Sequence, residues 1–306
     1  MNYKDINSER QFKDTTGKSK SEFASLLSDY ENTYLEEYGQ TYESYILENV
    51  TEEPKFKTLA EALFFVLFQL KNDMIWGSLG AVFAMAVSTA HDNFDFFSKL
   101  LEQTLEKKKV MPKRSFSSVE EFETHVSEAE ELIFDGTENL TERPQGYENQ
   151  KDKYSGKKKT HTDISLLLSD KQTKIYYVSN YYSGSNVDMG ILKQEFQPGM
   201  GWFKNHKVLF DLGFIGVGKK YDFKELIIGE KKPRSSKNNP NPELTKEQKE
   251  RNTSISKERI FVEHAIGKMK KYRILKNRCR LKSQELKNRI LGICAGLWNY
   301  HLLITT

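Results

Sequence analysis

Two short apolar runs, each ending in an aspartate, constrain the fold of this chain more than any other feature. Glu131-Leu-Ile-Phe-Asp135 and Lys207-Val-Leu-Phe-Asp211 have the length and composition of buried β-strands. A third acid, Glu263, lies within Ser256–Lys276, where apolar residues recur at helical spacing after a serine suited to cap a helix. This order of elements can gather the three acids at one edge of a mixed sheet.

The segments between these runs complete an α/β pattern. His161–Ser169 and Ile175–Asn180 are rich in β-forming residues and are separated by Asp170-Lys171, which predicts a hairpin. Asp188–Phe196 predicts a helix, and the polar, proline-containing segment Lys231–Asn252 predicts an exposed loop. We therefore expect an α/β domain over residues 115–306.

The first part of the chain has a different pattern. Residues 1–20 are polar and charged and predict an arm, whereas residues 21–110 predict an all-α module that resembles a helix-turn-helix unit. The basic segment Lys107–Arg114 is expected to link this module to the α/β domain. The expected helices are Ser21–Asn49, Leu59–Leu70, Ile75–Val87 and a last one that begins at Ser88 or Thr89 and ends at Lys109.

Several classes of protein are excluded by what the sequence lacks. Its two cysteines, Cys279 and Cys294, form neither a disulfide framework nor a cysteine-based zinc motif. The N-terminal residues have no apolar segment of the kind that a secretory signal needs. The apolar stretch Leu59–Val87 is interrupted after Leu70, and neither block reaches the roughly 20 residues of a membrane helix. We therefore expect two buried helices there and no membrane association.

Charge is unevenly distributed, although the net charge is only +4. Residues 1–130 contain 14 basic and 23 acidic side chains, whereas residues 131–306 contain 33 basic and 20 acidic ones. The densest basic stretch is Thr245–Arg289, with 15 basic and 5 acidic residues. A basic half indicates a polyanionic partner such as nucleic acid, and a solvated helix face is the alternative interpretation.

Three carboxylates that converge at a sheet edge repel one another unless a cation neutralises them. Oxygen ligands of this kind suit Mg²⁺ or Mn²⁺. Two such ions roughly 3.5–4 Å apart can activate an attacking oxygen and stabilise a leaving one at a phosphodiester. The structural alternative is that Asp135 and Asp211 are turn or cap residues and that Glu263 is part of a surface ion pair.

Further motifs surround these acids, in order along the chain. They are Asp135-Gly-Thr-Glu138, Glu142-Arg-Pro144, Tyr154-Ser-Gly-Lys-Lys-Lys-Thr-His161, Gly184-Ser185 with Asp188, Asp211-Leu-Gly-Phe-Ile-Gly216, Lys231-Lys-Pro-Arg234 and Ser256-Lys-Glu-Arg-Ile-Phe-Val-Glu263-His264. This ordered set resembles the DDE transposases of the insertion-sequence-five group and their PIF/Harbinger relatives. The resemblance covers Phe12 to about Arg280 and is specific from Asp135 onward.

The resemblance implies an RNase H-like catalytic domain, a mixed sheet flanked by helices. It implies that Asp135, Asp211 and Glu263 are the catalytic residues and the metal ligands. The implied cofactor is Mg²⁺, which Mn²⁺ can replace, with two ions bound. The implied reaction is metal-dependent phosphodiester hydrolysis at a transposon end, followed by strand transfer in which the freed 3′ hydroxyl attacks target DNA.

Basic residues near the acids are expected to contact DNA. Arg259 lies one helical turn before Glu263 and is suited to hold its carboxylate or to bind phosphate. An exposed basic turn is the alternative for the cluster that ends at His161, and a hydrogen-bonded structural role is the alternative for His161 itself. The full expected set is Lys157, Lys158, Lys159, His161, Arg259, Lys268, Lys270, Lys271 and Arg273.

Two segments depart from the pattern of the relatives. Asn186-Val187-Asp188 has no histidine directly before the aspartate, where relatives commonly carry one. Ser88–Leu101, the candidate DNA-reading segment of the helical module, is acidic and contains few cations. The helical module is therefore expected either to dimerise or to read DNA through a small local patch.

The leading functional hypothesis is a DNA transposase. The alternatives are a catalytically inactive, transposase-derived DNA-binding protein, an RNase H-fold nuclease without strand transfer, and a helical interaction protein with no nucleic-acid role. The expected partners are double-stranded DNA, namely terminal inverted repeats and target DNA, and a second copy of the chain in the DNA complex. The expected location is the bacterial cytoplasm at the nucleoid, or the nucleus in a eukaryotic host.

Overall fold

The structure is a computed structural model that describes residues 1–51, 53–236 and 240–305. The chain forms two compact units, which we describe separately. One unit contains residues 1–111 together with 269–306, and the other contains residues 112–268. The border between 111 and 112 lies close to the boundary expected from the sequence. Residues 269–306, which the sequence placed with the second domain, make their contacts with the helices of residues 1–111.

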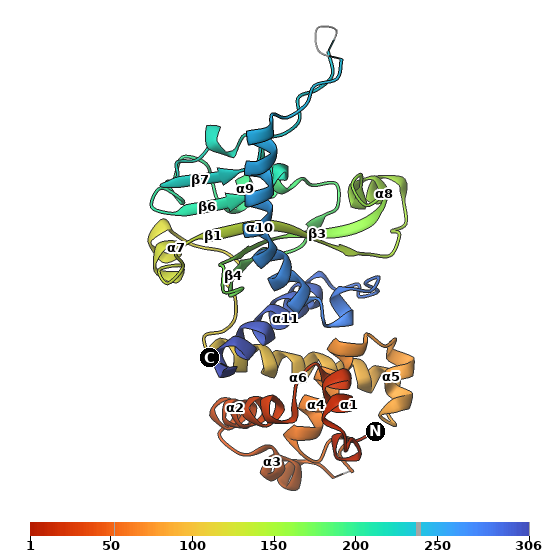
Figure 1. Ribbon diagram of the computed structural model, residues 1–306. Helices are drawn as coiled ribbons and strands as arrows, with labels where there is room; N and C mark the ends of the chain where they lie inside the picture. The colour runs from red at the N-terminus through yellow and green to blue at the C-terminus, as the bar shows by residue number, and fades with distance from the viewer. Residues whose placement is uncertain (52, 237–239, 306) are drawn as a thin grey trace. The chain divides into compact units, whose positions relative to one another are not determined.

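The first unit is entirely helical (Figure 1). Its central helix, α4, is buried along almost its whole length, as expected for the apolar run that begins at Leu59. The long helix α6 packs against α2, α4, α5 and the C-terminal helix α11. The elements are η1 (Tyr3–Asp5), α1 (Glu9–Thr16), α2 (Lys20–Tyr38), α3 (Tyr42–Asn49), α4 (Leu59–Asn72), α5 (Trp76–Val82), α6 (Val87–Lys107), η4 (Arg273–Leu275) and α11 (Gln284–Thr305).

Two features of the N-terminal segment differ from the expected arm and single long helix. Residues 1–20 contain α1 and bury Phe12, and the ammonium group of Lys18 donates a hydrogen bond of 2.8 Å to the carbonyl of Leu297. The expected helix Ser21–Asn49 is divided at Gly39, whose φ of 72° ends α2 in a left-handed cap. Thr41 then caps the separate helix α3.

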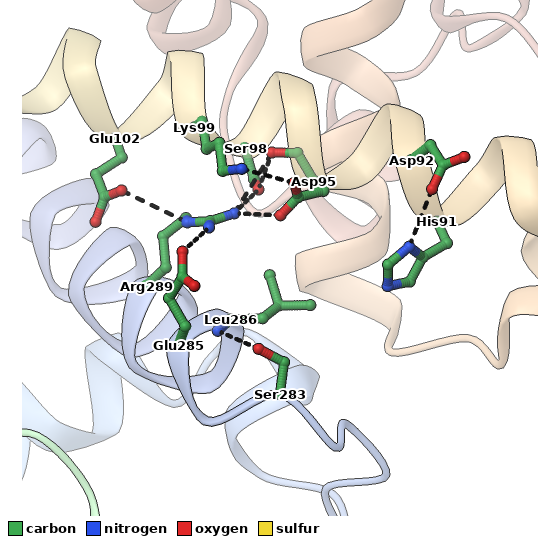
Figure 2. Close-up of polar contacts among 10 residues, drawn as sticks. All are labelled: His91, Asp92, Asp95, Ser98, Lys99, Glu102, Ser283, Glu285, Leu286 and Arg289. Carbon is green, nitrogen blue, oxygen red and sulfur yellow. Dashed lines mark hydrogen bonds and ion pairs between the residues drawn. The ribbon is translucent and has the colours of Figure 1, made fainter.

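A buried arginine joins α6 to α11 (Figure 2). The side chain of Arg289 is only 6% exposed, and its guanidinium lies 2.7 Å from Asp95 and 3.0 Å from Glu285. Its Nε atom lies 3.6 Å from the carboxylate of Glu102. Because one cation serves three acids from two helices, this cluster ties the C-terminal helix to the helical unit.

The second unit contains a mixed sheet flanked by helices, which confirms the coarse α/β prediction. Its strand order is β2-β3-β1-β6-β7, with β4 and β5 paired to β3. The pairing of β3 with β4 confirms the expected hairpin. The elements are α7 (Val119–His125), β1 (Leu132–Leu140), α8 (Tyr147–Lys153), β2 (Tyr154–Ser155), β3 (Thr160–Ser169), β4 (Ile175–Val178), β5 (Tyr182–Ser183), α9 (Asp188–Glu195), β6 (Lys207–Phe210), η2 (Leu212–Phe214), η3 (Val217–Lys219), β7 (Glu225–Ile228) and α10 (Lys246–Met269).

The two apolar runs that end in aspartate are the neighbouring parallel strands β1 and β6. Phe134 and Phe210 stack with their ring centroids 5.2 Å apart, in a core that includes Ile191 and Leu192 of α9. Because side chains alternate along a strand, Phe134 and Gly136 belong to the face covered by α9, and Asp135 belongs to the opposite face.

Helix α10 differs from the expected Ser256–Lys276 at both ends. It begins at Lys246, so the last part of the expected loop Lys231–Asn252 is helical, and it ends at Met269. Thr245 supplies the start signal, since its hydroxyl accepts a hydrogen bond from the backbone N–H of Gln248. Figure 1 shows α10 crossing the strands of the sheet. Among the described residues, no helix is both long and apolar enough to cross a membrane.

Candidate active site

The register of the sheet brings two of the expected acids together. Strand β1 pairs with β6 so that Ile133 lies beside Leu209, and the same offset places Asp135 beside Asp211. Asp211 directly follows β6, where its side chain caps η2 by accepting a hydrogen bond from the N–H of Gly213. Asp135 accepts one of 2.8 Å from the N–H of Gly136.

Helix α10 supplies the third acid and an arginine. Arg259 Nη2 lies 3.4 Å from Asp135 Oδ2 and 3.6 Å from Asp211 Oδ2. The same nitrogen lies 3.9 Å from Glu263 Oε1, one helical turn further along α10. The structure thus places all three expected acids around one guanidinium, although Glu263 remains more exposed than the two aspartates.

The electrostatics of this cluster show an incomplete neutralisation. Burial, together with the charges of Asp211 and Asp188, raises the pKa of Asp135 to about 6, against the opposing effect of Arg259. The Nε atom of Arg259 is buried and has no hydrogen-bond partner among the described residues. One guanidinium at distances of 3.4–3.9 Å therefore leaves the carboxylates short of positive charge.

A cavity of about 600 Å³ reaches one of these acids, Asp211. Its lining also includes Gly213, the start of α9 at Asp188, and Lys157 from the turn between β2 and β3. The carboxylate of Glu138 also lines it and accepts a hydrogen bond of 2.9 Å from Thr162. The cavity therefore combines charged side chains with apolar ones, which include Ile164, Val187 and Leu212.

The expected DNA-contacting residues fall into three places. Arg259 lies among the acids. The cluster Lys157–Lys159 forms an exposed turn next to the cavity, with His161 at the start of β3 and its ring 5.8 Å from that of Tyr154. Lys268 is near the end of α10 in the second unit. The last three residues of the expected set belong to the helical unit; they are Lys270, Lys271 and Arg273.

Sequence reasoning assigned no role to Asp188, which the structure places beside the expected acids. The side chain is largely buried, which raises its pKa, and Asp211 and Glu138 act in the same direction against Lys157. Two glycines, Gly136 and Gly213, lie just after Asp135 and Asp211 in the sequence. They were the sequence signals that could have indicated a side chain packed closely at this position.

The donor set fits a hard divalent cation in its chemistry. Asp135, Asp211 and Glu263 offer carboxylate oxygens, the ligands that Mg²⁺ and Mn²⁺ prefer. In the arrangement seen here, Arg259 lies between them, and across residues 1–51, 53–236 and 240–305 no three acid, histidine or cysteine side chains are grouped as a metal ion requires.

A mixed sheet whose neighbouring parallel strands bring Asp135, within β1, beside Asp211, directly after β6, and which faces a helix with an arginine and a glutamate, defines an α/β protein of nuclease type. A family model described as DDE superfamily endonuclease matches residues 134–299, more than half of the chain. The chain belongs to this family. The matched region begins one residue before Asp135 and includes Asp211 and Glu263.

A curated protein of Microchaete diplosiphon is similar to part of the chain. It is described as a probable transposase for insertion sequence element IS702, and it is 31% identical over 173 residues. The similarity covers 56% of this chain and 58% of the relative, so the chain spans little more than half the length of that protein. No solved structure matches the chain.

Proposed function

We propose that this protein is a DNA transposase of the insertion-sequence-five group, with PIF/Harbinger-like relatives and an RNase H-like catalytic domain. The observation that carries the proposal is the convergence of Asp135, Asp211 and Glu263 on Arg259. Family membership and the similarity to an insertion-sequence transposase support it. Three converging acids have no use in a protein that only binds DNA, which argues against a catalytically inactive derivative.

In this proposal the three acids hold Mg²⁺, or Mn²⁺ in its place, and two ions act together. When bound, the ions activate the attacking oxygen and stabilise the leaving oxygen at a phosphodiester. The acids would hold this charge at Asp135 within β1, at Asp211 directly after β6 and at Glu263 on α10. Water attacks the phosphorus at a transposon end and displaces the 3′ oxygen. The freed 3′ hydroxyl then attacks a phosphorus of target DNA, and the 3′ oxygen of the target strand leaves.

The basic residues around the site then bind the DNA backbone. With cations held by the acids, Arg259 would be available to a phosphate. Lys157 lines the cavity, and Lys158, Lys159 and His161 follow it in the chain. The remaining basic residues of the expected set would extend the contact along the duplex; these are Lys268, Lys270, Lys271 and Arg273.

The finer organisation of the protein belongs to the same proposal. The helical unit of residues 1–111 and 269–306 contains the helix-turn-helix-like module, which dimerises or reads DNA, and the unit of residues 112–268 contains the catalytic site. Because a transposase must pair two DNA ends, a homodimer is proposed in the DNA complex, which light scattering with and without end DNA tests. The proposed place of action is the nucleoid in the bacterial cytoplasm.

A cleavage assay tests the proposal directly. The full chain is given duplex DNA with the inverted repeats that flank its own coding region, in Mg²⁺, Mn²⁺ or EDTA. We expect metal-dependent nicking at the repeat boundary, which Asp135→Asn abolishes while DNA binding persists. Asp222→Asn, at an exposed aspartate outside the cluster, is the matched control and should cleave normally.

Two results separate the alternatives. A pre-cut end with a free 3′ hydroxyl is joined to a second duplex only by a transposase, so nicking without joining indicates a nuclease. Salt-sensitive DNA binding without nicking in either metal indicates an inactive, transposase-derived DNA-binding protein. Asp135→Asn that cuts at the wild-type rate refutes the assignment of the acids.

A further inference from the structure

A buried carboxylate lies where the strand that contains Asp135 begins. Glu131 directly precedes β1, and its side chain is only 5% exposed. Its Oε2 atom lies 3.2 Å from the ammonium group of Lys171 and 3.1 Å from that of Lys207. Its other oxygen is buried and accepts no hydrogen bond from any residue that the structure describes. Two lysines therefore share one oxygen of a buried acid.

These charges join helix α10 to the sheet. Lys171 lies in the turn between β3 and β4, and Lys207 is the first residue of β6. Lys171 also lies 3.4 Å from the carboxylate of Glu258, on α10. Against the lowering effect of burial, Glu131 and Glu258 raise the pKa of Lys171, so this lysine keeps its charge between the two acids. We call Glu131, Lys171, Lys207 and Glu258 the α10 network.

Glu258 belongs to the buried face of α10. Ile255, three residues before it, and Val262, four residues after it, are both buried, and residues at this spacing share one face of a helix. Arg259 directly follows Glu258, and Glu263 lies one turn further along, on the stripe of α10 that meets the aspartates. A shift or rotation of α10 that moves Glu258 therefore also moves Arg259 and Glu263.

Stability alone does not explain the α10 network. Replacing a buried ion pair by apolar side chains is often neutral or stabilising, because removing charges from water costs about as much as their attraction returns. A charged network adds a preferred geometry, since its ammonium groups and carboxylates must meet at defined distances. Apolar packing constrains this part of α10 only in part, because Ile255 and Val262 are buried whereas Ile260 is 42% exposed.

We propose that Lys171 is a positioning residue for the active site, which through Glu258 holds α10 where Glu263 meets the two aspartates. The contacts of Lys171 are with Glu131 and Glu258, so it acts through the helix and not on the DNA. Glu131 and Lys207 anchor the network at the starts of β1 and β6, the strands that bring the two aspartates together. This inference rests on the proposed function and adds a determinant of its geometry.

The experiment measures DNA cleavage by the full chain, its affinity for end DNA, and the exchange of its amide hydrogens. Lys171→Met removes the charge at the centre of the α10 network, and Glu258→Gln removes the charge on α10 while keeping the size of the side chain. Lys171→Arg restores a cation. Lys174→Met is the matched control, because Lys174 lies in the same turn but pairs with Glu128, at 2.8 Å and outside α10. Thermal unfolding reports the stability of each variant separately.

At saturating DNA, Lys171→Met and Glu258→Gln should cleave about ten- to hundredfold more slowly, since a misplacement of about 1 Å caused by a distant substitution can cost about a hundredfold. Their dissociation constants for end DNA should remain close to that of wild type, and Lys171→Arg should recover most of the rate. The amides of α10 should exchange faster in both variants, whereas those of β1 and β6 should not change. A purely structural role would lower stability and leave the rate per folded molecule unchanged.

Three outcomes overturn the role of Lys171 while leaving the proposed function intact. They are cleavage at the wild-type rate in both variants, unchanged exchange of the α10 amides, and an equal loss of rate in Lys174→Met. If the wild-type chain cuts no DNA in Mg²⁺ or Mn²⁺, the proposed function fails instead. The exchange of the α10 amides in Lys171→Met then still decides whether the network holds the helix.

Discussion

Removing the guanidinium of Arg289 should destabilise the helical unit far more than removing an exposed arginine. The perturbation is Arg289→Ala, which deletes a side chain that is 6% exposed and ion-paired to Asp95, Glu102 and Glu285. The substitution leaves acids of α6 and α11 facing one another without a cation, and it also removes the packing of the arginine stem.

The size of the loss in stability depends on how far the acids are shielded from water. Breaking a fully buried ion pair costs about 3–5 kcal/mol, because one charge is left uncompensated. Here the side chains of Asp95 and Glu102 are 35% and 30% exposed, so water recovers part of the loss. Asp95 also keeps Lys99 as a partner at 2.8 Å. We therefore expect a loss of about 2–3 kcal/mol in the free energy of unfolding of this unit.

Urea unfolding followed by the fluorescence of Trp298, which lies on α11, measures this loss. Arg289→Met should cost less than Arg289→Ala, since it keeps the apolar part of the side chain. Arg10→Ala is the matched control, because its partner Asp14 is 3.9 Å away and both side chains are largely exposed. The reasoning is refuted if Arg289→Ala and Arg10→Ala have the same midpoint.

Three further predictions concern pH, packing and DNA binding. Burial lowers the pKa of Lys18 to about 7 from 10.5, so the unfolded chain binds more protons between these values and stability should rise with pH across that window. Unfolding measured at several pH values should show this rise in wild type, and the rise should be smaller in Lys18→Met. Gly184→Ala should destabilise the second unit by about 1–3 kcal/mol in thermal or urea unfolding, because its Cβ would lie 2.7 Å from the carbonyl oxygens of Lys153 and Thr162; no change would refute the contact. Lys157→Ala should weaken DNA binding and reduce the slope of log affinity against log salt by about 1, whereas Lys204→Ala, an exposed control, should keep the wild-type slope.

The two aspartates could be predicted because their signal is local, although β1 continues past Asp135 to Leu140 and only Asp211 stands at the end of its strand. A short apolar run next to an acid favours a buried strand, and these two runs pair in parallel with Ile133 beside Leu209. Arg259 and Glu263 could be placed on one helix face from their spacing alone. The sequence therefore predicted these members of the cluster.

The remaining features depend on contacts that no local pattern encodes. The amino end of α10 is polar on all sides, so periodicity could not distinguish it from a loop. The end of α2 at Gly39 could have been predicted, because a glycine followed by Thr41 is typical of one helix ending and another beginning. The continuous helical spacing of apolar residues on both sides favoured a single helix instead. Asp188 approaches Gly136 only through the packing of α9 on the sheet, 52 residues away along the chain.

The geometry around Arg259 argues for a cation site over a structural ion pair. An arginine that forms a structural ion pair with a carboxylate makes paired hydrogen bonds of about 2.7–2.9 Å. Here one nitrogen is shared among three acids at 3.4–3.9 Å, and the buried Nε has no partner in the part of the chain that the structure describes. The single positive charge is outnumbered by the carboxylates, and Glu263 remains half exposed at the mouth of the cluster. Under the proposed function, a divalent cation held by these acids would supply the missing charge at distances that carboxylate oxygens favour, and the guanidinium would then be available to a phosphate of DNA.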